Sequence, residues 1–149
     1  MQNNPVEELL LACEDISRQV VMKSHAMATT LGLSPSDFEH LSLLVKTGPM
    51  TAGGLATTTA LTTGAITGII DRLEEAGLAN RQYDPSDRRR IIVVPTEKAV
   101  SAIQAFHDKF QRDFTRCVSN YSSTEQTAIL NFLRTTADFL REQTARIGE

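Results

Sequence analysis

The sequence predicts a mainly α-helical protein with one small β-hairpin. Apolar residues recur at steps of three and four over most of the chain, which indicates amphipathic helices. Two strand-like runs, at positions 78–83 and 91–94, are separated by the turn-forming Asp-Pro-Ser-Asp of residues 84–87. Directly before them, residues 51–73 have the pattern of two short helices joined by a tight turn. Helix, turn, helix and hairpin in this order make a winged helix-turn-helix, and we expect the N- and C-terminal helices that flank it to be dimerisation helices.

Length and composition are those of a single globular domain. The 149 residues are 41% hydrophobic and 22% charged, which is ordinary for a folded protein. We expect one domain over residues 1–149, with a winged-helix lobe at about 34–96 and flanking helices at about 6–31 and 97–147. No apolar run is long enough to span a membrane and the N-terminus lacks a signal-peptide pattern, so we expect a cytoplasmic protein without a membrane partner.

The N-terminal helix is predicted over positions 6–31. Pro5 stands near its start and Gly32 follows its end, where these residue types favour helix boundaries. Its apolar positions are too many for one neighbouring helix to cover. They are Val6, Leu9, Leu10, Cys13, Ile16, Val20 and Met27. His25 lies late in this helix and is interpreted as a solvated or capping histidine, with a ligand contact as the alternative.

Two shorter helices are predicted next. Ser34 as N-cap, Pro35 at the first helical position and Asp37 in the first turn open the earlier one. Its buried stripe is expected to consist of Phe38, Leu41, Leu44 and Val45. Thr51 opens the later one, which reaches about residue 58 and forms the first half of the helix-turn-helix.

The helix predicted from Thr62 to Leu73 has two different faces. Its buried face is expected to consist of Ile66, Ile69, Ile70 and Leu73. The opposite face has little bulk to clash with the floor of a DNA groove, and it carries Thr63, Ala65, Thr67, Gly68 and Arg72. Threonine hydroxyls can bind phosphates and their methyls can touch thymine, but the lack of charge over 57–67 predicts weak direct readout and more reliance on DNA shape. Arg72 can contact a phosphate or pair with an acidic residue at position 71, 74 or 75.

Three consecutive arginines, Arg88, Arg89 and Arg90, stand at the tip of the predicted hairpin. Their mutual repulsion is unfavourable unless an anion relieves it, and the planar guanidinium group suits phosphates and narrow minor grooves. Arg90 can instead form a salt bridge near the base of the strand. The net charge of the chain is −3, so the basic patch is local. We therefore expect double-stranded DNA as the partner, with few phosphate contacts per subunit and a need for dimerisation.

The C-terminal part is predicted to form two long helices. Thr96 begins the first, and a capping box at residues 122–126 begins the second. The apolar face of the first helix comprises Ile103, Phe106, Phe110, Phe114, Cys117 and Tyr121. A phenylalanine stripe indicates core packing, or the wall of a cavity beside the winged helix. Together with the N-terminal helix, these helices have more apolar surface than a winged helix can cover, which favours a two-fold dimer.

The winged-helix residues resemble the signature of the multiple antibiotic resistance regulator (MarR) family. The matching residues are Leu55-Ala56, Leu61, Ile66-Thr67, Asp71-Arg72-Leu73-Glu74, Gly77-Leu78, Arg81, Asp84-Pro85, Asp87-Arg88-Arg89 and Thr96. The flanking helices follow the family plan too, so the resemblance covers nearly the whole chain. Pro95 and Ala99 depart from the family pattern, which usually has Leu and often Gly there, and they put the junction between the second strand and the next helix in doubt.

The resemblance implies a dimeric bacterial transcription factor that binds a pseudo-palindromic operator. In such proteins the Arg of an Asp-x-Arg pair enters the minor groove while the Asp fixes its geometry, which carries over to Asp87 and Arg89. The expected DNA contacts are Thr51, Thr62, Thr63, Ala65, Thr67, Arg72, Asp87, Arg88, Arg89 and Arg90. Repression is the commoner direction in the family, released by a small, often aromatic or phenolic, effector. Its candidate contacts are His25, Phe38, Phe106 and Phe110.

Other interpretations of the sequence stay open. Some relatives sense oxidants through a cysteine in the first helix, and Cys13 lies in a similar place, although the adjacent acids disfavour a thiolate. Neither Cys13 nor Cys117 has metal-ligand spacing. A winged helix can also bind an acidic partner protein through its wing. An enzyme is the least expected class, since the chain lacks triad-like spacing and a Gly-rich phosphate loop, and we expect no cofactor and no metal.

Overall fold

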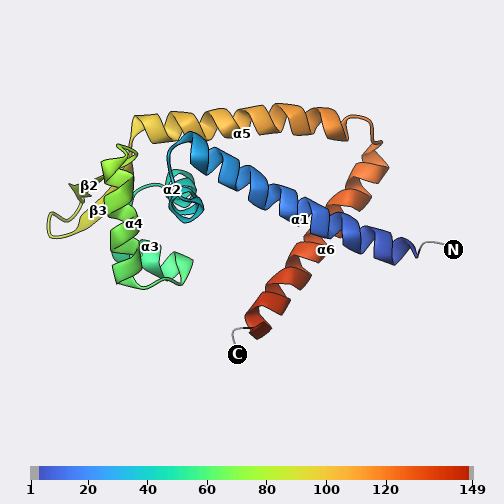
Figure 1. Ribbon diagram of the computed structural model, residues 1–149, viewed down its shortest axis with the longest axis horizontal. Helices are drawn as coiled ribbons and strands as arrows, with labels where there is room; N and C mark the ends of the chain where they lie inside the picture. Colours follow the sequence, from blue (N-terminus) through green and yellow to red (C-terminus); the bar gives the residue numbers. More distant parts are fainter. Residues whose placement is uncertain (1–3, 148–149) are drawn as a thin grey trace. The chain divides into compact units, whose positions relative to one another are not determined.

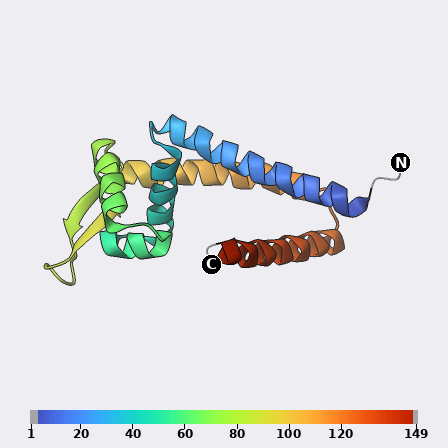
Figure 2. The same cartoon turned by 60° about the horizontal axis from the view of Figure 1, so that its bottom comes forward.

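The computed structural model describes residues 4–147, which form a winged helix with flanking helices (Figure 1, Figure 2). In chain order the elements are α1 (Pro5–Thr30), α2 (Pro35–Thr47), β1 (Met50–Thr51), α3 (Ala52–Thr59), α4 (Thr63–Glu75), β2 (Ala79–Tyr83), β3 (Ile91–Pro95), α5 (Glu97–Val118) and α6 (Ser123–Ile147). The chain divides into two compact units between Phe106 and His107, within α5. The first unit contains α1 and the winged helix, and the second contains the end of α5 and α6. The predicted fold class is confirmed.

Helices begin where the sequence places proline and capping residues. Pro5 is the first residue of α1. The Ser34 hydroxyl accepts a hydrogen bond from the backbone N–H of Asp37 at 3.1 Å, and the Thr62 hydroxyl accepts one from that of Ala65 at 3.3 Å. Each cap satisfies a donor that has no backbone partner in the first turn of its helix. The predicted starts of α1, α2 and α4 are therefore confirmed.

The core of the first unit lies between α2, α3, α4 and the small sheet. The predicted inner face of α4 is confirmed, because its four apolar residues are at most 4% exposed. These four residues belong to one buried cluster that also contains Leu41, Leu44, Leu55, Leu78 and Val93. Burying an aliphatic side chain of this size contributes about 1.5–3 kcal/mol, so this face holds α4 in place while its opposite face stays in solvent.

The sheet has three antiparallel strands in the order β1-β3-β2. The predicted hairpin is confirmed, with Tyr83 opposite Ile91 at the tip end and Ala79 opposite Pro95 at the base. Strand β1 was not predicted, and it pairs Met50 with Val93. Two residues are too few to show the alternating pattern by which a strand is recognised in a sequence.

The junction between β3 and α5 is intact despite the unusual Pro95 and Ala99. The Thr96 backbone N–H donates to the carbonyl of Leu78 at 3.0 Å, and the Thr96 hydroxyl donates to the carbonyl of Gly77 at 3.0 Å. The same hydroxyl accepts from the backbone N–H of Ala99 at 3.3 Å and thereby caps the first turn of α5. Ala99 is completely buried, so a small side chain fits there.

Large apolar side chains remain exposed on the flanking helices. On α1 they are Val6, Leu9, Leu10, Leu11, Ile16, Val20, Val21 and Met22, each more than half exposed. In the second unit, Phe110 and Phe114 stack with ring centroids 5.6 Å apart and are 45% and 51% exposed, and α6 exposes apolar side chains as well. The phenylalanine stripe is therefore only partly covered within one chain. Within residues 4–147, none of the helices combines the length and the hydropathy needed to cross a membrane.

Candidate nucleic-acid interface

The helix-turn-helix consists of α3, a three-residue turn and α4. Ala60 in the turn adopts a left-handed backbone conformation, with φ of 55°, and its N–H donates to the carbonyl of Ala56. The N–H of Leu61 donates to the same carbonyl at 3.2 Å, which closes the end of α3. Thr62 then caps α4. The chain thus turns sharply between the two helices. The outer face of α4 stays exposed along its first turns.

The outer face of α4 carries the threonines and the alanine that the sequence predicted. Thr62, Thr63, Ala65 and Thr67 are all exposed. Thr51 is half-buried, and its hydroxyl accepts a hydrogen bond from the backbone N–H of Gly54 at 3.0 Å as the N-cap of α3. Between positions 47 and 70 the sequence contains no Asp, Glu, Lys, Arg or His. The surface formed by α3 and α4 is therefore neutral up to Asp71 near the end of α4.

Carboxylates hold the tip of the wing in a fixed turn. The Asp84 carboxylate accepts hydrogen bonds from the backbone N–H and the hydroxyl of Ser86 at 2.8 and 2.6 Å. These bonds, and to a smaller extent the charge of Arg90, lower the pKa of Asp84. The Asp87 carboxylate accepts from the backbone N–H of Arg89 at 3.1 Å. Asp87 thereby fixes the backbone that carries Arg89, and the entry of Arg89 into a minor groove stays a prediction.

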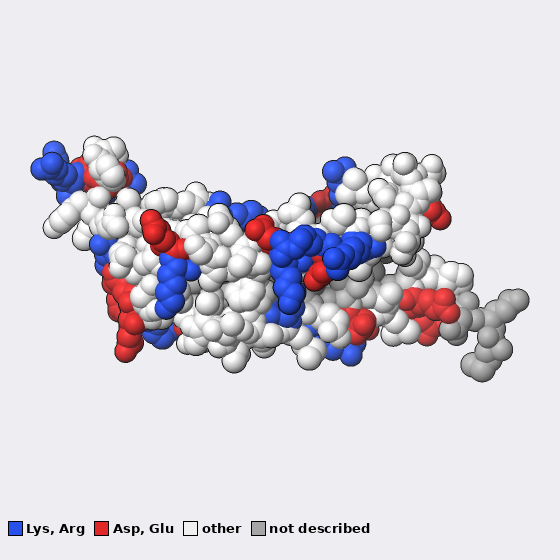
Figure 3. Space-filling model, turned by 90° about the horizontal axis from the view of Figure 1, so that it is seen from above, with Lys and Arg blue, Asp and Glu red and all other residues white. Residues whose placement is uncertain are grey.

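The arginines of the tip are exposed. The side chains of Arg88 and Arg89 make no hydrogen bond or ion pair with any residue in the described part of the chain. Arg90 lies 4.0 Å from Asp84, measured from Nε to Oδ2, which is a weak pairing at the base of the turn. Figure 3 shows basic side chains, with acidic ones beside them, at the end of the first unit that carries the wing in Figure 1. The free positive charge of the wing is thus local.

Arg81 ties strand β2 to helix α4. Its guanidinium group binds Asp71 at 2.7 Å and also binds Glu74, while its backbone N–H donates to Glu74 at 2.7 Å. The hydrogen bond to Asp71, followed by the charge of Glu74, raises the pKa of Arg81. Both acids lie near the C-terminal end of α4. Arg81 therefore fixes strand β2 of the wing against α4.

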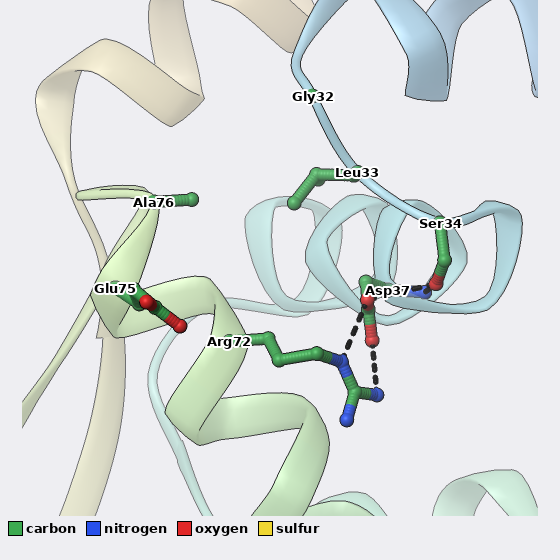
Figure 4. A pocket seen from close by; sticks show the side chains of 7 residues that line it. All are labelled: Gly32, Leu33, Ser34, Asp37, Arg72, Glu75 and Ala76. Atoms are coloured by element: carbon green, nitrogen blue, oxygen red, sulfur yellow. Dashed lines mark hydrogen bonds and ion pairs between the residues drawn. The ribbon is translucent and has the colours of Figure 1, made fainter.

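Arg72 ties α4 to α2 (Figure 4). Its Nε and Nη2 donate to the two carboxylate oxygens of Asp37 at 2.9 and 2.6 Å, and Ser34 donates to the same carboxylate at 2.7 Å. The Asp37 side chain is 3% exposed and the Arg72 side chain 54%. The hydrogen bond from Arg72 is the largest cause that lowers the pKa of Asp37. The sequence suggested a phosphate or a neighbouring acid for Arg72, and Asp37 was recognised only as part of a helix cap.

The pair lines a pocket of about 650 Å³ in the first unit. Figure 4 shows Arg72 reaching from α4 to Asp37 in α2, and Glu75 on the α4 side. A second pocket, of about 370 Å³, is lined by residues of α2, the end of α3 and Leu61. It includes the buried His40, whose Nδ1 lies 2.7 Å from the Ser36 carbonyl.

The residues proposed as effector contacts line neither of these two pockets. His25 is exposed on α1 and Phe38 is buried in α2. Phe106 is half-buried in α5, and Phe110 stacks on Phe114 in the second unit. Of the two free cysteines, Cys13 is half-buried and Cys117 is exposed. Their role as effector contacts stays a prediction.

Comparisons with known proteins match both the winged helix and most of the chain. A model of the MarR family matches residues 33–91. The chain is 34% identical to the HTH-type transcriptional regulator YcgE of Bacillus subtilis, over 90% of this chain and 87% of YcgE. It is 30% identical to the HTH-type transcriptional repressor NicR of Pseudomonas putida, over 71% of this chain and 67% of NicR. A solved MarR family protein from Bacillus stearothermophilus has the same fold, with a TM-score of 0.71 at 24% identity over 95% of this chain and 99% of that one.

Proposed function

The chain belongs to the MarR family of DNA-binding transcriptional regulators, and from this premise we propose that it acts as a homodimer that represses transcription from a pseudo-palindromic operator. The family consists of regulators and not of enzymes. The observation that carries the proposal is the wing tip, where Arg88 and Arg89 are exposed and have no partner among the described residues. We propose that the protein is cytoplasmic, because bacterial DNA lies in the cytoplasm.

We propose that α4 enters the major groove and that the wing enters the adjoining minor groove. The outer face of α4 is exposed and free of bulky side chains, which supports the first assignment. Arg89 would enter the minor groove, since Asp87 holds its backbone and leaves its guanidinium free. Arg88 and Arg90 would contact phosphates. Thr62 and Thr63, at the N-terminus of α4, would contact the backbone of the same groove.

We propose one domain over residues 1–149, in which α1, α5 and α6 form the dimerisation region and residues 34–96 form the DNA-binding lobe. The exposed apolar side chains of α1, α5 and α6 support this, because patches of this kind on a globular protein mark interaction surfaces. A second copy of the chain would cover them through a two-fold interface. It would place two wings and two α4 helices on half-sites about one helical turn apart.

We propose that a small, aromatic or phenolic effector releases the protein from DNA. A ligand can change DNA affinity only if it binds the two states of the protein with different affinity. The proposal therefore requires that the compound that raises the unfolding temperature of the free protein also weakens its binding to the operator.

Fluorescence anisotropy with a duplex from upstream of the protein's own gene, and with a scrambled duplex, tests the central proposal across a series of salt concentrations. We expect preference for the native duplex. If Arg88 and Arg90 of both subunits each neutralise one phosphate, the logarithm of affinity falls with the logarithm of salt concentration with a slope of about −4. Equal and weak binding to both duplexes would reject the proposal and favour a wing that contacts an acidic protein. An affinity that diamide and peroxide leave unchanged would exclude oxidant sensing through Cys13.

A further inference from the structure

We propose that Thr67 selects thymine in the major groove through its side-chain methyl group, and that α4 reads base edges by apolar contact and not by donating hydrogen bonds. This inference rests on the proposed placement of α4 in the major groove. The inference names the chemical group of the operator that α4 recognises, the C5-methyl of thymine. Its test is chosen so that it can fail while DNA binding by the protein stands.

The hydroxyl of Thr67 is already used within the helix. It donates to the backbone carbonyl of Thr63 at 2.9 Å, while the side chain as a whole is exposed. A hydroxyl has one proton, so an oxygen that donates it to the helix can offer DNA only its acceptor capacity. The Cγ2 methyl is then the group of this side chain that is not bound to the helix.

The same arrangement recurs on α3. The hydroxyls of its three threonines, Thr57, Thr58 and Thr59, donate to backbone carbonyls four residues earlier, at 3.0, 2.9 and 2.8 Å. Back-bonding of this kind is common for threonine in helices. These three hydroxyls, like that of Thr67, therefore have no proton left for a base edge, whereas Thr62 and Thr63 are the hydroxyls that the proposed function assigns to the DNA backbone.

The composition of the segment excludes the side chains that most often read bases by hydrogen bonds. Bidentate contacts to guanine or adenine require Arg, Lys, Asn or Gln, and contacts to cytosine use Asp or Glu. None of these residue types occurs between positions 47 and 70. The next cation, Arg72, is bound to Asp37. Among the groups that base edges present in the major groove, the thymine C5-methyl is the one that an apolar side chain can contact. Ala65, exposed on the same helix, presents a methyl group as well.

Substitution of deoxyuridine for thymine tests the inference, because it removes the C5-methyl and keeps every hydrogen-bonding group. The duplex is the one that wild-type protein binds most tightly in a selection from randomised sequences. Each thymine is replaced singly, and the dissociation constant is measured by fluorescence anisotropy. Transfer of one buried methyl group corresponds to about a fourfold change in affinity. We expect a loss of that size at one or two thymines of each half-site.

Two variants assign the effect to Thr67. In Thr67→Ser the hydroxyl and its helical bond remain but the methyl is gone, so the thymine-to-uracil ratio should fall from about four to about one at the contacted position. In Thr67→Val a second methyl replaces the hydroxyl, and the ratio should stay at about four or rise. Thr127→Ser is the matched control, because the Thr127 hydroxyl donates to the Ser123 carbonyl at 2.8 Å in α6, outside the winged helix. It should leave the ratio unchanged.

The outcomes separate this inference from the proposed function. If the selected duplex is bound specifically but no deoxyuridine substitution weakens binding, recognition of thymine methyls is wrong and the operator-binding proposal stands. If Thr67→Ser retains the full thymine-to-uracil ratio, another side chain contacts the thymine methyl and the assignment to Thr67 is wrong. If the selection yields no preferred duplex, both the proposed function and the inference are overturned.

Discussion

Substitution of Arg72 should destabilise the protein more than substitution of its partner Asp37, because the ion pair is buried on one side only. The Asp37 side chain is 3% exposed and that of Arg72 54%. Arg72→Gln leaves a carboxylate in the protein interior without its cation. Asp37→Asn leaves a guanidinium group that water can reach. The group left behind sets the cost of breaking such a pair.

The expected magnitudes follow from these environments. Removal of one partner of a buried ion pair costs about 3–5 kcal/mol, and we expect the lower end, about 3 kcal/mol, for Arg72→Gln because water reaches this pair from the Arg72 side. Asp37→Asn loses charge-assisted hydrogen bonds, for which we expect about 1.5 kcal/mol. The double variant should cost less than the sum of the two, since its second substitution removes a group that has already lost its partner.

The pH dependence provides an internal check. The hydrogen bond from Arg72 lowers the pKa of Asp37 in the folded protein. A carboxyl group whose folded-state pKa is depressed contributes stability that is fully present above its unfolded pKa of about 3.9 and is lost as the pH falls through the folded value. The difference in unfolding free energy between wild type and Asp37→Asn should therefore be full at pH 7 and shrink below about pH 4.

Urea titrations followed by circular dichroism, at pH 7, 5 and 3.5, measure these differences. Equal costs for the two single variants, or a larger cost for Asp37→Asn, would refute the assignment of Asp37 as the buried partner. The operator affinity of Arg72→Gln, measured beside its unfolding free energy, separates an effect on stability from an effect on DNA binding. If Arg72→Gln lost operator affinity with an unchanged unfolding free energy, Arg72 would contact DNA, as the sequence first suggested.

Three further predictions concern the wing, the turn and the core. Arg89→Ala should weaken operator binding by about 1–3 kcal/mol in anisotropy titrations, and an unchanged affinity would remove Arg89 from the minor groove. Ala60→Gly should stabilise the protein by about 1 kcal/mol because Ala60 has a φ of 55°, while Gly77→Ala, at a φ of 67°, should destabilise it by a similar amount; thermal unfolding with equal signs for both would contradict this. Ile70→Asp should abolish the folded state, since it places a charge at a fully buried position, and a cooperative unfolding transition near that of wild type would disprove it.

The parts of the fold that the sequence predicted depend on neighbours along the chain. Helix caps join residues three apart, the inner face of α4 follows from steps of three and four, and the hairpin follows from a turn between two apolar runs. The wing arginines were likewise interpreted as an anion-binding patch from neighbours along the chain. Three adjacent cations repel one another whatever the tertiary structure. Such signals lie within one or two helical turns of sequence.

The interactions that sequence reasoning missed connect residues far apart in the chain. Asp37 and Arg72 are separated by 35 positions, and a cap residue for α2 was already a sufficient reason for an acid at 37. Arg81 was noted as a residue of the family signature, and the structure bonds it to Asp71 and Glu74. No local pattern distinguishes an arginine that faces DNA from one that faces a carboxylate brought near by folding.

Four arginines of the winged helix fall into two groups according to whether they have a partner. Arg72 fixes α4 to α2, and Arg81 fixes β2 to α4, while Arg88 and Arg89 are without partners in the described chain. An arginine at the wing tip reaches the groove beside α4 only if the hairpin keeps its angle to that helix. Because a preorganised surface loses less conformational freedom on binding, we expect Arg81 to raise affinity through the position of the wing and not through a contact of its own. The dependence of binding on salt reports phosphate contacts, so it should follow the tip arginines and be insensitive to Arg81.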